Sequence, residues 1–282
     1  EKISLERLNE VQKQDHKEKK KLKKITTQSN YQKNGIEKGI YLKNLSFQYE
    51  GPKSPYVLKD INLHIPEGKI TAIVGASGSG KTTLMKLLLR FYDPIKGEIF
   101  YNYDNILNLS PKSIRENTGV VMQDGYIFSD TIERNIATAD KEINKQQLKK
   151  AVQIANIEEF VESLPLKYNT KIGAAGNGLS GGQKQRLLIA RAVYKNPNYI
   201  FFDEATSALD AENEKIIHDN LQQFFKGKTV LVIAHRLSTV KNADQIVVLK
   251  KGEIVEIGNH QQLVQNKAEY FNLVKNQLEL GN

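Results

Sequence analysis

The sequence predicts an α/β fold with a mostly parallel sheet, and two observations support this prediction. Strand-sized apolar segments at 199–202, 229–234 and 245–249 are separated by helical patterns. Earlier in the chain, a buried-type strand at 69–74 leads through a glycine-rich loop into a helical pattern at 81–92. Strands that alternate with helices favour parallel pairing, because each helix returns the chain to the start of the next strand.

The composition is that of an ordinary globular protein. The chain has 282 residues, of which 39% are hydrophobic and 26% charged, enough for one large domain or two lobes around a core. It has no cysteine, which excludes disulfide bonds, thiolate metal sites and a cysteine nucleophile. It has no apolar run of about 18 residues, so no membrane span is predicted. The chain starts at Glu1 and has no signal-like segment. We interpret it as a cytoplasmic piece of a longer protein.

The formal net charge of +9 raises the question of a nucleic-acid partner. Residues 1–38 hold eleven Lys/Arg and six Asp/Glu, so a net +5 lies there. Residues 17–24 read KEKKKLKK and contain no aromatic residue. Such a run is typical of a solvated linker or of a surface near anionic lipid headgroups. We therefore expect no specific nucleic-acid partner.

The coarse organisation follows from changes in pattern along the chain. Residues 3–15 predict a short helix with a narrow apolar stripe, and residues 26–38 a polar linker. Strands are predicted at 40–47 and 57–65. The segment from about 130 to 182 is helical, rich in Lys, Gln and Glu, and without strong strand patterns. It predicts an inserted helical lobe.

Residues 75–82 read GASGSGKT and fit the pattern G-x-x-x-x-G-K-[ST]. Glycines let the backbone approach a triphosphate closely, so that successive N–H groups and the positive end of the next helix face its oxygens. Lys81 is then a mobile charge for the β- and γ-phosphates, and the Thr82 hydroxyl a ligand for Mg²⁺. By chance this pattern arises in about one such chain in a hundred. Its strand–loop–helix setting favours a phosphate loop over an ordinary surface turn.

Residues 199–204 read YIFFDE, an apolar strand that ends in two acids. Alone this signal is weak, because acids at strand ends often cap the next helix. When the same chain also has a phosphate loop, each of the two acids has an expected function. Asp203 is expected to hold Mg²⁺ through water, and Glu204 to polarise the water that attacks the γ-phosphate.

Residues 179–183 read LSGGQ, which chance produces in only a few of every ten thousand chains of about this length. An amphipathic helical pattern follows, so Ser180 is predicted at a helix N-cap. The Ser180 hydroxyl and the N–H groups of Gly181 and Gly182 then form a second anion site.

Together, these motifs give residues 40–275 a resemblance to the ATPase domain of ABC (ATP-binding cassette) transporters. The resemblance implies a P-loop NTPase core with a mostly parallel sheet, an N-terminal antiparallel β subdomain and an inserted helical subdomain at about 130–182. It implies that residues 39–282 are the ATPase domain, and that residues 1–38 are the end of a transmembrane helix and a linker. ATP and Mg²⁺ are the implied cofactors.

The resemblance also assigns the site residues. Catalytic roles are implied for Glu204, His235 (the switch histidine) and Gln123 (the Q-loop), and a metal site for Thr82, Gln123 and Asp203. His235 also follows the strand 229–234, close to the expected γ-phosphate. The implied ATP-binding residues are Tyr49, Gly75, Ser77, Gly78, Ser79, Gly80, Lys81, Thr82 and Thr83. The signature motif is Leu179, Ser180, Gly181, Gly182 and Gln183, and the D-loop is Ser207, Ala208, Leu209 and Asp210. Tyr49 is assigned as the aromatic that stacks on adenine, with Tyr41 and Tyr56 as nearby alternatives.

The family implies partners as well. Two such domains pair head to tail, so that each ATP lies between Walker A of one copy and the signature motif of the other. A second copy and a transmembrane domain are therefore the expected partners, at the cytoplasmic face of the bacterial inner membrane.

Within the family, residues 170–192 resemble bacterial exporters rather than importers, and residues 3–10 resemble the end of an exporter's last transmembrane helix. With residues 176–178, they look most like peptidase-containing peptide or bacteriocin exporters. One departure is Ala174-Ala175 after Gly173, where many exporters carry an acid in a loop that contacts the membrane domain.

Two other functions compete with transport. One is an ABC ATPase that acts on nucleic acid or the ribosome, but such proteins typically carry tandem cassettes or a long coiled-coil insertion. The other is a regulatory domain that binds ATP without turnover. The presence of Lys81, Asp203, Glu204 and His235 argues against the second.

Overall fold

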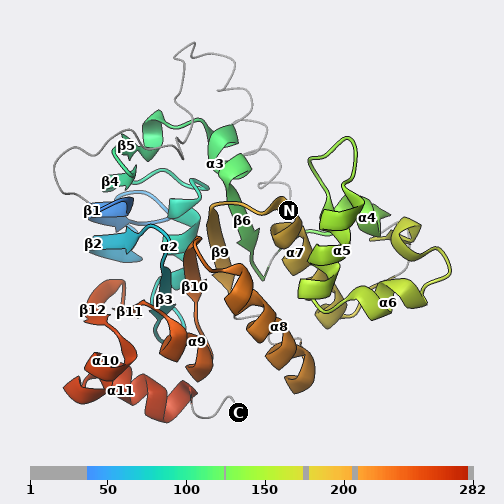
Figure 1. The fold of residues 1–282 in the computed structure, drawn as a ribbon. Helices are drawn as coiled ribbons and strands as arrows, with labels where there is room; N and C mark the ends of the chain where they lie inside the picture. Colours follow the sequence, from blue (N-terminus) through green and yellow to red (C-terminus); the bar gives the residue numbers. More distant parts are fainter. Residues whose placement is uncertain (1–36, 124, 174–177, 205–208, 279–282) are drawn as a thin grey trace.

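The computed structural model describes residues 37–123, 125–173, 178–204 and 209–278. The predicted helix at 3–15 and most of the linker at 26–38 lie outside the described residues, as do Ala174 to Asn177 and the D-loop residues Ser207 and Ala208. Two large sheets, the helices that cover them and a helical segment with a small two-stranded sheet make up the described fold (Figure 1). Within these ranges, no helix combines the length and the apolar character that a membrane span requires.

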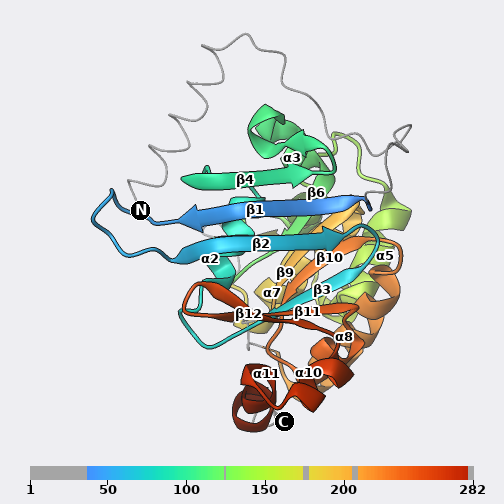
Figure 2. The same ribbon diagram turned by 90° about the vertical axis from the view of Figure 1, so that its left-hand side faces the viewer.

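The first sheet is antiparallel and has the strand order β2-β1-β4-β5, and Figure 2 shows β2, β1 and β4 side by side. Its strands are β1 (Gly39–Phe47), β2 (Leu58–Pro66), β4 (Lys96–Tyr101) and β5 (Asp104–Asn105). Along β1, the buried side chains include Ile40, Leu42, Leu45 and Phe47. One face of this sheet is therefore apolar, as expected for an antiparallel sheet that covers a core on one side.

The second sheet is mostly parallel, with the order β12-β11-β3-β10-β9-β6. Its strands are β3 (Ile70–Val74), β6 (Thr118–Val121), β9 (Tyr199–Asp203), β10 (Thr229–Ile233), β11 (Gln245–Lys250) and β12 (Glu253–Gly258). Only the edge strand β12 pairs antiparallel. In β10, Val230 and Val232 face one core, while Leu231 and Ile233 face the other. Both faces of this sheet are covered, which explains the continuous apolar runs in its sequence.

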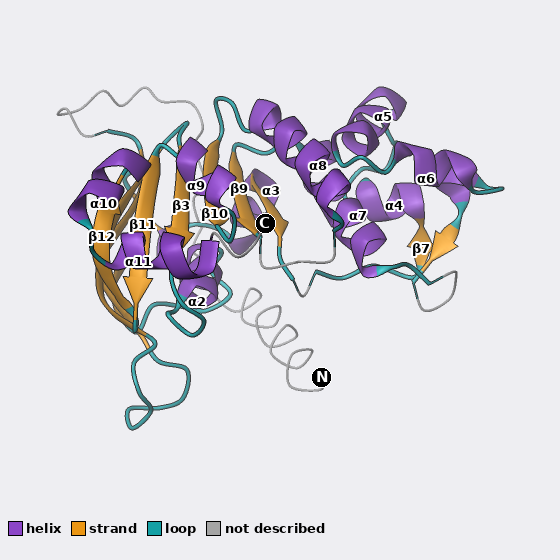
Figure 3. Cartoon of the chain, turned by 90° about the horizontal axis from the view of Figure 1, so that it is seen from below, coloured by secondary structure: helices purple, strands orange, loops and turns teal. Residues whose placement is uncertain are grey.

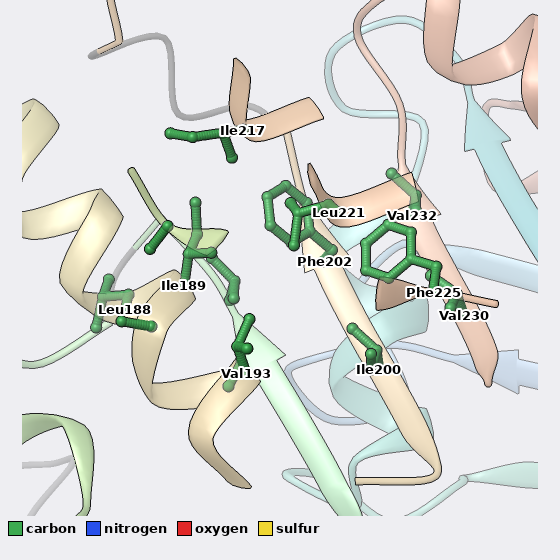
Figure 4. Packing of buried hydrophobic residues seen from close by; sticks show 14 of the residues in the cluster. Leu188, Ile189, Val193, Ile200, Phe202, Ile217, Leu221, Phe225, Val230 and Val232 are labelled. Atoms are coloured by element: carbon green, nitrogen blue, oxygen red, sulfur yellow. The ribbon is translucent and has the colours of Figure 1, made fainter. Parts of the chain in front are cut away.

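Helices cover the two faces of the parallel sheet. The face toward the antiparallel sheet packs on α2 (Lys81–Leu88), with α3 (Pro111–Asn117) and the 3₁₀ turn Ile106–Asn108 beside it. The opposite face packs on α7 (Gly181–Lys195) and α8 (Ala211–Phe224), as Figure 4 shows. The helices of the C-terminal part are α9 (Leu237–Asn242), α10 (His260–Asn266), α11 (Glu269–Leu273) and a π-helical turn at Val274–Leu278.

The helical segment projects to one side of the sheets (Figure 3). It comprises α4 (Ile132–Ile136), α5 (Lys145–Ile154), α6 (Glu158–Ser163) and the 3₁₀ turn Lys167–Asn169. The short strands β7 (Asp130–Thr131) and β8 (Lys171–Ile172) pair at its base. The predicted fold class is confirmed: a mostly parallel sheet, an antiparallel N-terminal sheet and inserted helices.

One predicted element is too long. The helix expected at 81–92 ends at Leu88, because Arg90 adopts a left-handed backbone conformation (φ 56°) that a helix cannot continue through. The Arg90 guanidinium instead donates to the carbonyls of Ile106 and Leu109. Phe91, within the predicted helical range, lies beyond this end and is 56% exposed.

Candidate functional site

Four predicted site segments follow neighbouring parallel strands. The glycine loop follows β3, Gln123 follows β6, Glu204 follows β9 and His235 follows β10. These strands lie in the order β3-β10-β9-β6, and parallel strands present their carboxyl ends at one edge of the sheet. Ligands in α/β proteins bind at this edge. The fold therefore gathers residues that lie up to 160 positions apart in sequence.

The glycines of the loop at 75–82 are required by its backbone. A Cβ on Gly75 would lie 2.4 Å from the carbonyl oxygen of Leu249 and 2.6 Å from Ser79 Oγ. Gly78 and Gly80 have φ values of 79° and 105°, which strain any residue with a Cβ. The loop therefore keeps its backbone open toward a ligand, with Ser77 and Gly78 exposed.

Polar groups inside the loop suit a polyphosphate. The Lys81 ammonium donates to the carbonyls of Gly75 (2.5 Å) and Ala76 (3.1 Å). Burial lowers the Lys81 pKa, and the nearby Asp203 carboxylate opposes that shift. Ser79 Oγ is buried and has no hydrogen-bond partner among the described residues. A bound triphosphate would pair with the Lys81 ammonium and would accept a hydrogen bond from the Ser79 hydroxyl and from the exposed backbone N–H groups.

The donors predicted to hold Mg²⁺ fit that ion chemically. Thr82 offers a hydroxyl, Gln123 an amide oxygen and Asp203 a carboxylate, all hard oxygen donors. Thr82 and Gln123 are exposed, whereas Asp203 is 3% exposed. Since β6 and β9 are paired up to Val121 and Phe202, Gln123 and Asp203 follow at the same end of neighbouring strands.

His235 lies beside the Asp203 carboxylate, with Nε2 3.9 Å from Oδ1. Its side chain is 43% exposed. Desolvation, Lys81 and Arg236 lower the His235 pKa, and Asp203 partly offsets them. A pKa below the usual 6.5 favours neutral imidazole at pH 7, which has one N–H donor for a phosphate oxygen.

Glu204 is held by hydrogen bonds from one short stretch of chain, residues 235–239. Its Oε2 accepts from the backbone N–H of His235 at 3.0 Å, and its Oε1 accepts from the Thr239 hydroxyl. Burial raises the Glu204 pKa, and these hydrogen bonds together with nearby Arg236 oppose the shift. The carboxylate lines a cavity between the sheet, α8 and α9, beside Phe202.

Tyr49 lies at the end of β1, against the helix that follows the glycine loop. Its hydroxyl lies 2.5 Å from Thr83 Oγ1, and Thr83 is buried. Its ring is 48% exposed and packs edge-on against Phe47 (5.1 Å) and Tyr92 (5.4 Å). An exposed, oriented ring beside the phosphate loop suits stacking on a nucleobase.

The two alternative aromatics have other contacts. Tyr41 stacks on His64 with 4.2 Å between ring centres, toward the start of β1. Tyr56 packs beneath the Lys96 ammonium, 5.3 Å from the ring centre. These contacts favour Tyr49 over both alternatives.

The signature segment begins a different helix. Ser180 is the N-cap of α7: Oγ accepts from the N–H of Gln183 at 3.1 Å, and Gln183 Oε1 accepts from the N–H of Ser180 at 3.0 Å. Leu179 packs on the core, and Ser180 and Gly181 are exposed. Because α7 and α2 pack on opposite faces of the parallel sheet, the glycine loop and the signature segment belong to separate surfaces of one chain.

In the D-loop, the structure describes Leu209 and Asp210. Leu209 packs against the core, and Asp210 is the N-cap of α8, with its carboxylate accepting from the N–H of Asn213 at 2.8 Å. This hydrogen bond and a second one, which the Asn213 side-chain amide donates to Oδ2, lower the Asp210 pKa. Asp210 therefore has a local structural role.

Sequence reasoning did not identify three residues in or beside the site, Thr239, Tyr92 and Arg236. Thr239 contacts Glu204, and its only signal is a position four residues after His235, on the following helix α9. Tyr92, beside Tyr49, was assigned only to a helical pattern. Arg236 forms an ion pair with Glu214 of α8, which spacing alone could not reveal.

Comparisons with known proteins indicate the family of the chain. A protein-family model described as "ABC transporter" matches residues 58–207, more than half of the chain. The chain is 46% identical over 246 residues to a leukotoxin translocation ATP-binding protein LktB of Mannheimia haemolytica, and 45% identical to that of Mannheimia glucosida. Each alignment covers 87% of this chain and 34% of the relative, so the chain spans about a third of these relatives.

A solved structure is similar as well. A bacterial Atm1-family ABC exporter with ATP bound superposes with a TM-score of 0.80 at 35% identity. The match covers 89% of this chain and 44% of that one.

Proposed function

This chain belongs to the ABC transporter family, as an ATPase domain of the exporter type, and we propose that two copies of it close head to tail on two Mg·ATP to power export of a polypeptide. Hydrolysis reopens the pair. The movement passes to membrane helices of the same transporter.

The observation that carries this proposal is the separation of two anion sites in one chain. Lys81 begins α2 and Ser180 caps α7, and these helices pack on opposite faces of the parallel sheet. Each helix start offers unpaired backbone N–H groups that attract a phosphate. One ATP can contact both sites only if the second belongs to another copy.

The proposed chemistry assigns each residue a task. Lys81 and the loop N–H groups hold the β- and γ-phosphates, and Tyr49 stacks on adenine. Thr82, Gln123 and Asp203 would hold Mg²⁺, which neutralises phosphate charge when bound. Glu204 orients the attacking water and accepts its proton, and His235 donates a hydrogen bond to the γ-phosphate.

A candidate surface for the membrane domain lies on the loop after Gln123. Tyr126 and Phe128 are 66% and 47% exposed, and their rings pack edge-on at 5.2 Å. The loop is held firmly: Arg191 donates to the Tyr126 carbonyl (2.8 Å), and the Asn135 side chain accepts from the Phe128 N–H (2.8 Å). Gly173, which precedes the departure at 174–175, approaches the Phe128 backbone closely. We assign this exposed aromatic pair to the contact with the transmembrane domain.

The relatives suggest the class of cargo. The leukotoxin translocation proteins favour a polypeptide, which agrees with the peptide or bacteriocin exporters that the sequence resembles. Residues 39–282 are then the ATPase domain, with its helical subdomain at about 130–182, and residues 1–38 connect it to the membrane. The proposed location is the cytoplasmic face of the bacterial inner membrane.

The head-to-tail arrangement can be tested by size-exclusion chromatography. Glu204→Gln should elute as a dimer with Mg·ATP and as a monomer without it, because blocked turnover preserves the bound ATP. Adding Ser180→Arg should abolish the dimer, since a bulky cation then occupies the partner's phosphate site. A dimer that survives Ser180→Arg would contradict the proposed role of the signature segment.

A further inference from the structure

Thr239 lies in α9 and is 3% exposed, yet no family motif assigned above includes it. Its hydroxyl donates to Oε1 of Glu204, while the His235 N–H donates to Oε2. Both donors come from one stretch of five residues, 235–239. The Glu204 N–H also donates to the Ile233 carbonyl at 3.0 Å, which fixes the backbone from which the side chain extends.

We propose that Thr239 is a positioning residue for ATP hydrolysis, acting through Glu204 by fixing the orientation of its carboxylate. This inference rests on the proposed function, in which Glu204 orients the attacking water. One hydrogen bond to one oxygen leaves the carboxylate free to rotate about the Cγ–Cδ bond. A second donor on the other oxygen defines the carboxylate plane.

Among the described side chains, the Thr239 hydroxyl is the one that donates a hydrogen bond to the Glu204 carboxylate, whereas the other donors are the backbone N–H groups of His235 and Arg236. Arg236 attracts the Glu204 carboxylate electrostatically, but its guanidinium is paired with Glu214 of α8. The His235 backbone N–H binds the opposite oxygen. Without the Thr239 hydroxyl, Oε1 would lose a donor, and the carboxylate would adopt other orientations.

The placement of both donors links two parts of the site. His235, proposed to contact the γ-phosphate, and Thr239 lie on one continuous turn of chain that enters α9. Glu204 directly follows the neighbouring strand β9. The orientation of Glu204 is therefore set by the segment that carries His235.

The test compares Thr239→Val, which removes the hydroxyl at nearly constant shape, with Thr239→Ser, which keeps it. In the 282-residue chain, we expect Thr239→Val to lower kcat about 10- to 100-fold, the cost of a misplaced catalytic group. KM for ATP should change less than about twofold, because uniform binding is unaffected. Thr239→Ser should restore most of the rate.

Thr118→Val is the matched control. Thr118 is also 3% exposed, and its hydroxyl donates to the Ile114 carbonyl at 2.8 Å, at the start of β6. Its loss should leave kcat unchanged. ATP affinity of each variant verifies that the domain is folded.

A double variant separates positioning from a general structural effect. In the Glu204→Gln background, Thr239→Val should cause no further loss of single-turnover rate, because its effect requires the carboxylate. A full additional loss there would overturn the inference, as would an unchanged or raised kcat in Thr239→Val alone. If Glu204→Gln itself hydrolyses ATP at the wild-type rate, the proposed function of Glu204 fails, whatever Thr239 does.

Discussion

The Tyr49 hydroxyl and Thr83 Oγ1 lie 2.5 Å apart and join the end of β1 to the first turn of α2. This hydrogen bond connects the proposed base-binding ring to the helix of the phosphate loop. The hydrogen bond and the contacts with Phe47 and Tyr92 restrain the ring, so stacking on a base costs little side-chain entropy.

Tyr49→Ala should weaken ATP binding while leaving tripolyphosphate binding unchanged. Loss of base–aromatic stacking costs about 1–3 kcal/mol, roughly 5- to 150-fold in Kd. Tripolyphosphate lacks the base, so its affinity reports binding by the phosphate loop alone. Titration of both ligands with Mg²⁺ checks this, with Tyr103→Ala, an exposed tyrosine between β4 and β5, as the control. Equal weakening of both ligands would show a disturbed loop instead.

Lys81→Ala should sharply weaken binding of both ATP and tripolyphosphate, because its ammonium is proposed to face the β- and γ-phosphates. In this structure the ammonium donates to two loop carbonyls, so its removal also loosens the loop. Lys86→Ala, on the last turn of the same helix, is the control for charge. Wild-type ATP affinity in Lys81→Ala, measured by titration with Mg²⁺, would refute the phosphate-loop assignment.

The fold and the main site elements could be predicted from the sequence because their signals are local. The glycine loop, the LSGGQ segment and the strand that ends in Asp203 and Glu204 each combine a short motif with an adjacent strand or helix pattern. Parallel strand order then follows from the alternation of elements. The strands β4, β5, β6, β7, β8 and β12 were not predicted, because brief or half-exposed segments carry little periodicity.

Contacts between distant segments could not be predicted in this way. The Thr239 hydroxyl reaches Glu204 across 35 positions, and Tyr49 reaches Thr83 across 34. Neither pair has a spacing rule, because both depend on how separate elements pack. The end of α2 at Leu88 similarly depends on Arg90, whose guanidinium binds carbonyls after β5.

Alanine at both Tyr126 and Phe128 should uncouple transport from hydrolysis in the complete transporter. The pair is exposed and held by Arg191 and Asn135, so its loss removes an interaction surface without opening the core. Cargo export should fall, while nucleotide affinity of the 282-residue chain stays unchanged. Leu166→Ala, 66% exposed after α6, is the control. Full export by the double variant would argue against this surface.

Any binding of DNA or RNA by the chain should be weak and should collapse between low salt and about 200 mM salt. The basic segment 17–24 has no interleaved aromatics that could stack on bases. Fluorescence anisotropy with labelled oligonucleotides over a salt series measures this. Tight binding at about 200 mM salt would support the competing nucleic-acid function.

Glu204→Gln should retain ATP binding but lose about 10²- to 10⁴-fold in hydrolysis, the usual effect of removing a positioned general base. Binding relies on Lys81, the loop N–H groups and Mg²⁺, none of which this change removes. The amide is nearly isosteric and still accepts hydrogen bonds from the Thr239 hydroxyl or the His235 N–H, so the local fold should persist. Phosphate release, measured alongside ATP titration, separates the two effects.

Glu253→Gln, an exposed acid at the start of β12, makes the same charge change away from the site and should hydrolyse ATP normally. Loss of ATP binding in Glu204→Gln would instead assign this carboxylate a structural role, because its burial beside α9 would then matter more than its reactivity. Hydrolysis at the wild-type rate would show that another group accepts the proton. Asp203 would be the first carboxylate to examine, since it directly precedes Glu204 and its Oδ1 lies 3.9 Å from His235 Nε2.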